Sequence, residues 1–257
     1  QSYSNDTQSY SNDTQSYSND TLFQASAISS LMAGNFDGTM TFKELKAHGS
    51  FGLGTVDNLD GEMVGLDGQF YQVKSNGVAY PINDSMETPF AEAVFFNPDE
   101  TLILNGTSNL TQIENYMDNK LATKNIFYAI RIDGTFDYVK TRSVPAQSKP
   151  YPTLAEAVKD QKVFEFYNVS GTLVGFRAPD YANGINVPGY HMHFITSDRS
   201  SGGHLLDLEI KNASIEVDDR SELEIVLPNN EEFNQMNLSG NSNNQTILKK
   251  IESDTKK

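Results

Sequence analysis

The sequence predicts an α+β fold made of two similar units, each combining short helices with a mainly antiparallel or mixed β-sheet. Helix signals followed by a series of short strand patterns occur twice along the chain. The run Lys149-Pro150-Tyr151-Pro152 stands between the two series and interrupts regular structure. We therefore expect a boundary near residue 148, with an N-terminal unit of residues 22–148 and a C-terminal unit of residues 149–257. A chain of 257 residues can bury a sizeable core in one large domain or two small ones.

Helix signals open each series. Apolar residues within 22–34 have the spacing of a short helix that ends at Gly34. The pattern Thr-x-x-Glu starts at Thr41, Thr111 and Thr153. In such a capping box the hydroxyl and the carboxylate each satisfy a backbone amide of the first helical turn. A helix is therefore expected after each threonine, the second one running towards residue 121.

Strand patterns separated by turn dipeptides follow the helices. Three Asp-Gly pairs, which are typical of tight hairpins, predict turns at residues 60–61, 67–68 and 133–134. The expected strands are 51–56, 62–66, 70–73, 126–132 and 136–144, and then 163–167, 172–176, 189–195, 204–210, 214–217 and 223–227. The Asn-rich stretch 229–244 is expected to be irregular, and residues 245–252 to form a final short helix.

The N-terminus is a repeat. The heptapeptide Gln-Ser-Tyr-Ser-Asn-Asp-Thr fills residues 1–21 in three identical copies. Because it has no aliphatic side chain with which to build a core, we expect a disordered extension. The chain starts with Gln rather than Met, which fits either a removed export signal or trimming, and we expect a cytoplasmic rather than an exported protein.

Composition excludes several classes of function. With 19 Lys and Arg against 34 Asp and Glu, the net charge is −15, so neither nucleic acid nor an anionic membrane surface is an expected partner. No apolar run approaches the length of a membrane span. The absence of cysteine excludes disulfides, iron–sulfur clusters, thiolate zinc sites and cysteine nucleophiles. Any transition metal must be held by His, Asp and Glu.

Three of the four histidines lie within fourteen residues, at His191, His193 and His204. Side chains two apart on a strand project from the same face, with backbone positions roughly 7 Å apart. The polar, Gly-rich stretch 196–203 can turn the chain so that His204 returns against the first pair. Three imidazoles on one face form the ligand set of a catalytic zinc or similar divalent ion with a position open for substrate.

Simpler interpretations remain for other residues. His48 precedes a glycine in an expected turn and is assigned no role, and Arg142, judged from the residues alone, is expected to be a surface cation.

Two further functions stay open: a cupin-like metal-dependent dioxygenase or isomerase in which Asp198 adds a carboxylate ligand, and a non-enzymatic binding protein that uses a metal as a structural clip.

Longer motifs in both halves resemble the α-acetolactate decarboxylase family. In the second half these are Gly171–Phe176, Pro179–Tyr181, Gly184-Ile185, Val187, Gly189–Ile195 and Gly202-Gly203-His204. In the first half they are Phe51–Thr55, Leu59–Glu62, Leu66–Tyr71 and Phe127–Gly134. The resemblance runs from about residue 22 to residue 252.

The resemblance implies an enzyme that converts 2-acetolactate to (R)-acetoin and carbon dioxide with Zn²⁺ or another divalent transition metal. The metal would act as a Lewis acid and accept the electrons of the enediolate. Two α/β units with the metal site between them, paired into a homodimer, are implied as well. The implied site residues are the zinc ligands His191, His193 and His204, the catalytic residues Glu62, Arg142 and Glu252, and the substrate-binding Thr55. One of the two glutamates would supply the proton.

Overall fold

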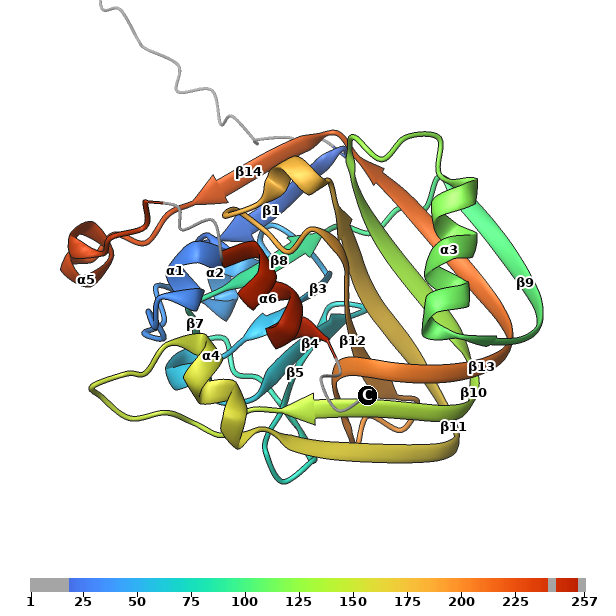
Figure 1. Cartoon of the computed structure of the whole chain (residues 1–257), viewed down its shortest axis with the longest axis horizontal. Coiled ribbons are helices and arrows are strands. Elements are labelled where there is room, and N and C mark those ends of the chain that lie inside the picture. Colours follow the sequence, from blue (N-terminus) through green and yellow to red (C-terminus); the bar gives the residue numbers. More distant parts are fainter. Residues whose placement is uncertain (1–18, 240–243, 254–257) are drawn as a thin grey trace, which may run out of the picture.

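Two β-sheets form the centre of the molecule (Figure 1). The computed structural model describes residues 19–239 and 244–253. The first sheet has seven strands in the order β14-β1-β8-β3-β4-β5-β6. In chain order they are β1 (Thr21–Ala25), β3 (Phe51–Thr55), β4 (Glu62–Leu66), β5 (Gln69–Val73), β6 (Ala79–Pro81), β8 (Ala91–Val94) and β14 (Glu222–Val226). A separate two-stranded pair joins β2 (Met40–Thr41) to β7 (Glu87–Thr88).

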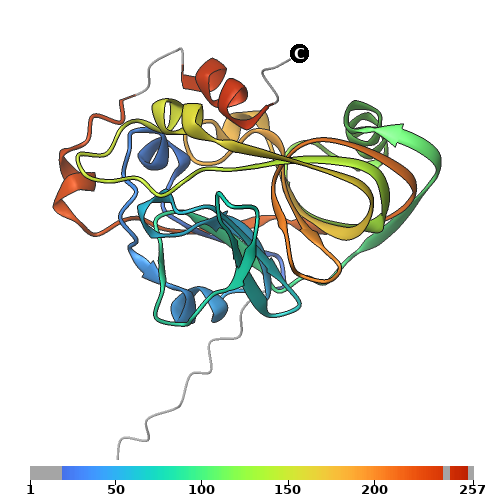
Figure 2. The same ribbon diagram turned by 90° about the horizontal axis from the view of Figure 1, so that it is seen from below.

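The second sheet has five strands in the order β10-β11-β12-β13-β9. They are β9 (Glu100–Asn109), β10 (Phe127–Ser143), β11 (Lys162–Ala178), β12 (Gly189–Thr196) and β13 (Gly202–Arg220). Strand β10 also pairs with β13, so the sheet closes on itself, and Figure 2 shows its strands curling into a ring. A core that includes Phe136, Phe194 and Ile210 fills this ring, and a second core that includes Phe51 and Phe176 packs between the two sheets.

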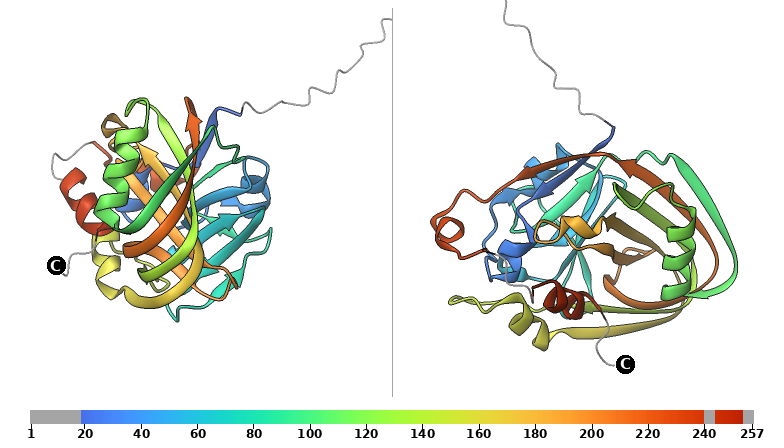
Figure 3. Two further views of the ribbon diagram at one scale, coloured as in Figure 1. Left: turned by 90° about the vertical axis from the view of Figure 1, so that its right-hand side faces the viewer. Right: turned by 45° about the horizontal axis from the view of Figure 1, so that its top comes forward.

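Short helices surround the sheets. They are α1 (Ile28–Met32), α2 (Phe42–Lys46), α3 (Leu110–Lys120), α4 (Leu154–Ala157), α5 (Glu231–Gln235) and α6 (Asn244–Glu252). Helix α3 packs on the five-stranded sheet, whereas α6 lies beside α4 (Figure 3). An apolar cluster that includes Ile28, Leu154 and Leu248 joins α1, α4 and α6. Within the described ranges, no helix is long and apolar enough to cross a membrane.

Two of the three predicted capping positions are confirmed. The Thr41 and Thr153 hydroxyls accept hydrogen bonds from the backbone amides of the residues three positions later, at the starts of α2 and α4. The third was wrong by two residues, because Asn109 rather than Thr111 caps α3. Its side chain accepts from the Gln112 amide, and the Gln112 side chain bonds back to the Asn109 amide.

The turn prediction at residues 133–134 is wrong. At the confirmed hairpin of Asp67 and Gly68, both residues have positive φ, as a tight two-residue turn requires. Asp133 instead pairs with β11 and β13, and Gly134 pairs with β11, so β10 continues through them with a register shift against β13. Strands β11 and β13 likewise continue through predicted breaks, with left-handed residues at Asn168 and Asn212 in place of turns.

The structure also differs from the sequence prediction at the N-terminal end and at the edges of the sheets. Residues 21–25 form β1 rather than part of a helix, and only residues 28–32 are helical. Thr21, the last residue of the heptapeptide repeat, already belongs to β1, whereas residues 1–18 of the repeat lie outside the described residues. Strands β6 to β9 were not predicted. The final helix is confirmed as α6.

The mixed α+β class is confirmed, but the sheets exchange strands across the expected boundary near residue 148. Strands β9 and β10, which precede it, belong to the five-stranded sheet with β11 to β13. Strand β14, which follows it, pairs in parallel with β1 at the edge of the other sheet. The division into units 22–148 and 149–257 stays a prediction.

Candidate active site

Three histidines meet on one face of the five-stranded sheet, as their spacing predicts. His193 on β12 lies directly opposite His204 on β13, and His204 in turn lies opposite Arg142 on β10. His191 lies two residues before His193 on β12 and therefore projects from the same face. One potential ligand atom from each histidine lies within 4.8 Å of those of the other two. The group forms a compact nitrogen-rich cluster.

Two glycines let the histidine hairpin close. Gly203 has a φ of +131°, and a Cβ there would lie 2.6 Å from the backbone carbonyl oxygen of Arg142. A Cβ on Gly202 would collide with the carbonyl of Phe194. The Gly-Gly pair therefore allows β13 to run tightly between β12 and β10 and so brings His204 into register.

The cluster holds its imidazoles neutral. All three histidines are buried, and burial lowers the pKa of each, to about 3 for His191 and well below the usual value for His193 and His204. The Arg142 cation contributes to this lowering of the pKa in all three histidines. Nδ1 of His193 donates to the Met63 carbonyl 2.8 Å away, which leaves the lone pair on Nε2. Neutral imidazole is the form that binds metal ions.

Glu62 reaches the cluster from the other sheet. It opens β4 and lies opposite Thr55 on β3. The Thr55 hydroxyl donates a 2.8 Å hydrogen bond to the carbonyl of Gly61, which fixes the backbone just before Glu62. The two carboxylate oxygens of Glu62 lie 3.5 Å from Nε2 of His193 and 3.5 Å from Nε of Arg142.

Arg142 is buried, with only 4% of its surface exposed, so the expectation of a surface cation is wrong. Its Nη1 donates to the carbonyl of Ile251 at 2.6 Å and to the side chain of Gln161 at 3.2 Å. Its Nη2 lies 3.9 Å from Oε2 of Glu252. One guanidinium thus contacts β4, the segment before β11 and the end of α6.

Glu252 ends α6 and completes the cluster. Its Oε2 atom lies 3.2 Å from Nε2 of His204 and 3.5 Å from Nε2 of His191. Its backbone carbonyl lies 2.9 Å from Nε2 of His204 and accepts from it. The last turn of the helix therefore contacts two histidines through both side chain and backbone.

Burial favours the protonated form of both carboxyl groups, Glu62 and Glu252. Burial, with a smaller contribution from the charge of Glu252, raises the pKa of Glu62 to about 7 against the opposing charge of Arg142. Burial also raises the pKa of Glu252, again against Arg142. Glu62 can therefore act as an acid close to neutral pH, and the pKa of Glu252 is shifted in the same direction.

All seven predicted site residues line one cavity of about 40 Å³. Apolar side chains that include Leu59, Phe90 and Val144 complete its wall. Nε2 of His193 and Oε2 of Glu252 are buried there without a hydrogen-bond partner among the described residues. Buried acceptors with nothing to bind are costly, and a divalent cation would satisfy both. The residues present therefore fit a metal ion.

Comparison with known proteins indicates one protein family. The family model for alpha-acetolactate decarboxylase matches residues 22–240. The chain is 50% identical over 231 residues to the alpha-acetolactate decarboxylase of Methanosarcina mazei, covering 90% of this chain and 80% of that protein. It is 45% identical over 218 residues to that of Brevibacillus brevis, covering 85% and 76%.

The chain belongs to the alpha-acetolactate decarboxylase family.

A solved family member has the same fold. The crystal structure of alpha-acetolactate decarboxylase from Bacillus subtilis strain 168 superposes with a TM-score of 0.89 at 40% identity. The superposition covers 91% of this chain and all of that one. The family model ends before Glu252, so the assignment of that residue rests on its position at the cluster.

Asp198 and His48, which the sequence analysis considered separately from the site residues, lie away from the histidine cluster. Asp198 is exposed in the turn after β12, where hydrogen bonds from Ser200 and Thr196 to its carboxylate lower its pKa to about 2. It is therefore not placed to complete a cupin-like ligand set. His48 stacks on Phe23 with ring centroids 3.7 Å apart and belongs to the packing of the first sheet.

Sequence reasoning missed three parts of this decarboxylase-family site. Gln161 binds Arg142, the carbonyl of Met63 orients His193, and Phe90 lines the cavity. A backbone carbonyl leaves no trace in the residue type, and neither Gln161 nor Phe90 belongs to a local motif. Their contacts depend on how the sheets meet.

Proposed function

We propose that the protein decarboxylates 2-acetolactate to (R)-acetoin and carbon dioxide with the help of a divalent metal ion, and that the native ion is zinc. The observation that carries the proposal is the buried cluster of three neutral imidazoles with Glu62, Arg142 and Glu252 around it. Membership of the alpha-acetolactate decarboxylase family supports the same reaction.

His191, His193 and His204 would hold the ion, with Glu62 or Glu252 close enough to add a carboxylate oxygen. A bound divalent ion supplies Lewis-acid stabilisation of the electron pair that the departing carbon dioxide leaves behind. No organic cofactor is then required as an electron acceptor.

Arg142 would orient the substrate. 2-Acetolactate is a carboxylate anion, and the cationic Arg142 guanidinium lines the cavity. It is already fixed by Gln161 and Ile251, so little ordering would be needed on binding. Thr55 holds the strand connection that places Glu62 and lines the same cavity.

A glutamate would supply the proton. Loss of carbon dioxide from the anion leaves an electron pair on carbon, and one proton must be added there for each molecule of acetoin. Glu62 and Glu252 are candidate donors because burial raises the pKa of both carboxyl groups. Addition from a fixed carboxyl to one face would set the (R) configuration.

Metal analysis combined with turnover of racemic 2-acetolactate tests the proposal. We expect stoichiometric zinc, release of carbon dioxide, and acetoin of one configuration on a chiral column. A protein without stoichiometric metal and without carbon dioxide release would overturn it. Oxygen uptake without acetoin would favour a dioxygenase, and a metal needed for folding in a chain inert toward acetolactate would favour a structural clip.

We also propose that the protein works as a homodimer, as the resemblance implies. Exposed apolar residues at the edge strand β14, including Val226 and the following Leu227, support a contact there. Light scattering coupled to size-exclusion chromatography is expected to give twice the chain mass. A monomer at micromolar concentration would contradict this part of the proposal.

A further inference from the structure

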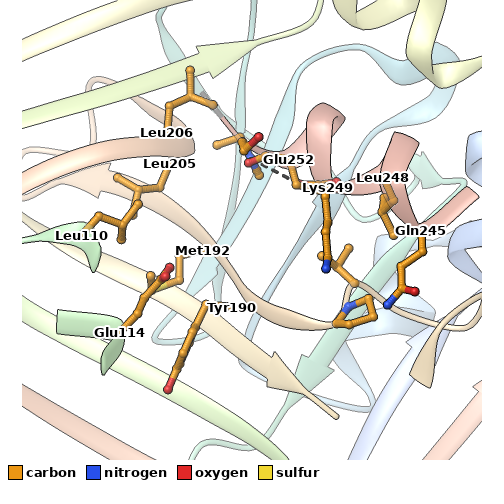
Figure 4. Close-up of a pocket in the computed structure, with 14 residues that line it drawn as sticks. Leu110, Glu114, Tyr190, Met192, Leu205, Leu206, Gln245, Leu248, Lys249 and Glu252 are labelled. Carbon is orange, nitrogen blue, oxygen red and sulfur yellow. Dashed lines mark hydrogen bonds and ion pairs between the residues drawn. The ribbon is translucent and has the colours of Figure 1, made fainter. Parts of the chain in front are cut away.

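A second, larger cavity adjoins the histidine cluster. It measures about 430 Å³ and shares His204 and Glu252 with the small central cavity. Figure 4 shows Leu110 and Glu114 of α3 on one side, Gln245 and Lys249 of α6 on the other, and Glu252 between them. The central cavity, at about 40 Å³, is much smaller, so a nine-heavy-atom acid needs additional space or a path into it.

The exposure of its lining changes from one end of this cavity to the other. Lys249 and Ser253 are exposed, whereas His204 is buried with 2% of its surface exposed. Mainly apolar side chains line the rest of the cavity, including Met192, Leu205 and Leu206. A cavity with a solvent-facing end, an apolar wall and a polar inner end has the form of a passage.

In the part of the chain that the structure describes, the cavity on the other side of α6 does not lead to the histidine cluster. A cavity of about 510 Å³ there is lined by residues such as Ile247, Lys250 and Ile251, and it reaches none of the seven site residues. Ile251 is buried between this cavity and the cluster. The hydrogen bonds of Arg142 to Gln161 and to the Ile251 carbonyl close that side.

We propose that the cavity between α3 and α6 is the passage through which the substrate reaches the cluster, and that its apolar wall receives the alkyl groups of the substrate. This inference rests on the proposed function. A 2-alkyl-2-hydroxy-3-oxo acid carries two alkyl groups and one carboxylate. The alkyl groups match the wall of Met192, Leu205 and Leu206, and Lys249 places a cation at the exposed end. The width of the passage then limits the length of the alkyl group that the enzyme accepts.

Two substitutions on α6 test which side of the helix the substrate uses. Gln245→Trp narrows the proposed passage, and Ile247→Trp fills the cavity on the other side of the same helix. We expect Gln245→Trp to lower kcat/KM for 2-acetolactate about tenfold, and to lower it further for the homologue with a 2-ethyl group. Ile247→Trp should stay within about twofold of the unsubstituted protein for both substrates.

A variant from the opposite wall and a measurement without catalysis complete the test. Leu110→Phe on α3 should reproduce the effect of Gln245→Trp. Dipicolinate, an anionic chelator, should remove zinc from both variants more slowly than from Ile247→Trp. The proposal is overturned if Ile247→Trp is the variant with slow zinc removal, or if zinc removal is unchanged in Gln245→Trp and Leu110→Phe. Failure of the unsubstituted enzyme to form acetoin would refute the proposed function, whereas the chelator rates would still decide the route.

Discussion

Arg142 and Ile251 are joined by a hydrogen bond of 2.6 Å from Nη1 to the backbone carbonyl oxygen. The bond ties a strand of the five-stranded sheet to the last turn of α6, 109 residues later in the chain. Glu252 is the next residue, and its carboxylate lies 3.2 Å from His204. The arginine therefore acts on the cluster in two ways, as a charge and as the anchor of the helix that carries the second glutamate.

The variant Arg142→Lys tests whether activity depends on the positive charge of this side chain alone or also on the geometry of its hydrogen bonds. Lysine keeps the positive charge but cannot reach Glu62, Gln161 and the Ile251 carbonyl together, because its ammonium has no planar fork. We expect kcat/KM for 2-acetolactate to fall by about 100-fold or more, with the metal still bound. Arg131→Lys, at the partly exposed pairs with Asp67 and Asp133, is the matched control and should stay near full activity. Full activity in Arg142→Lys would show that charge alone is sufficient.

Glu62→Gln and Glu252→Gln should identify the proton donor. Glutamine keeps the size of each side chain but cannot deliver a proton, so the variant of the donor should lose about 100-fold or more in kcat. The acetoin that it still forms should approach a racemic mixture, since water would protonate either face. Chiral chromatography of the product measures this directly. If both variants kept full rate and stereoselectivity, neither carboxyl would be the donor.

Metal removal should abolish activity and lower thermal stability. His193→Ala removes one of three converging imidazoles, and we expect zinc content to fall to background and acetoin formation to be lost. Chelated wild-type protein should have a lower Tm, which added zinc restores, because an ion that binds only the folded state stabilises it. His48→Ala substitutes the histidine that stacks on Phe23 and should keep its zinc. Equal zinc content in the two variants would contradict the assigned ligand set.

Glu92→Gln should change how stability depends on pH. Glu92 is fully buried on β8 and accepts a 2.9 Å hydrogen bond from Asn186. Burial raises its pKa from 4.5 to about 8, against the opposing effect of that hydrogen bond. Between these values the folded chain keeps a proton that the unfolded chain has lost, so the free energy of unfolding falls as pH rises and levels off above about 8.

The glutamine variant removes this contribution. Denaturant titrations at pH 5 and pH 8 should show a smaller loss of stability for Glu92→Gln than for the wild type, by an amount on the order of a few kcal/mol. Glu156→Gln on the exposed surface of α4 is the control and should follow the wild type. A Glu92 variant with the wild-type pH dependence would mean that this carboxyl is ionised in the folded protein.

The histidine hairpin could be predicted because its information is local. His191, His193 and the Gly-Gly pair before His204 lie within one short segment, and strand alternation alone places the side chains on one face. The burial of Arg142 could not be predicted in this way, since its partners lie 19 and 109 residues away. Only the resemblance to a family placed it in the site.

The predicted breaks in the long strands were wrong for a related reason. An Asp-Gly pair favours a turn, but Asp133 and Gly134 lie in a strand that is paired on both sides, and these pairings outweigh the local preference. Local sequence patterns also could not predict that β9 belongs to the five-stranded sheet and β14 to the seven-stranded sheet. Sheet order depends on contacts between segments far apart in the chain.

The position of Glu252 has a consequence for how the protein matures. The three imidazoles come from one β-hairpin and can meet as soon as it pairs, whereas α6 is made after that hairpin. A ribosome-bound or C-terminally clipped chain could therefore capture its ion before it can turn over substrate. Metal uptake and catalytic competence would then be separate events in the life of each molecule.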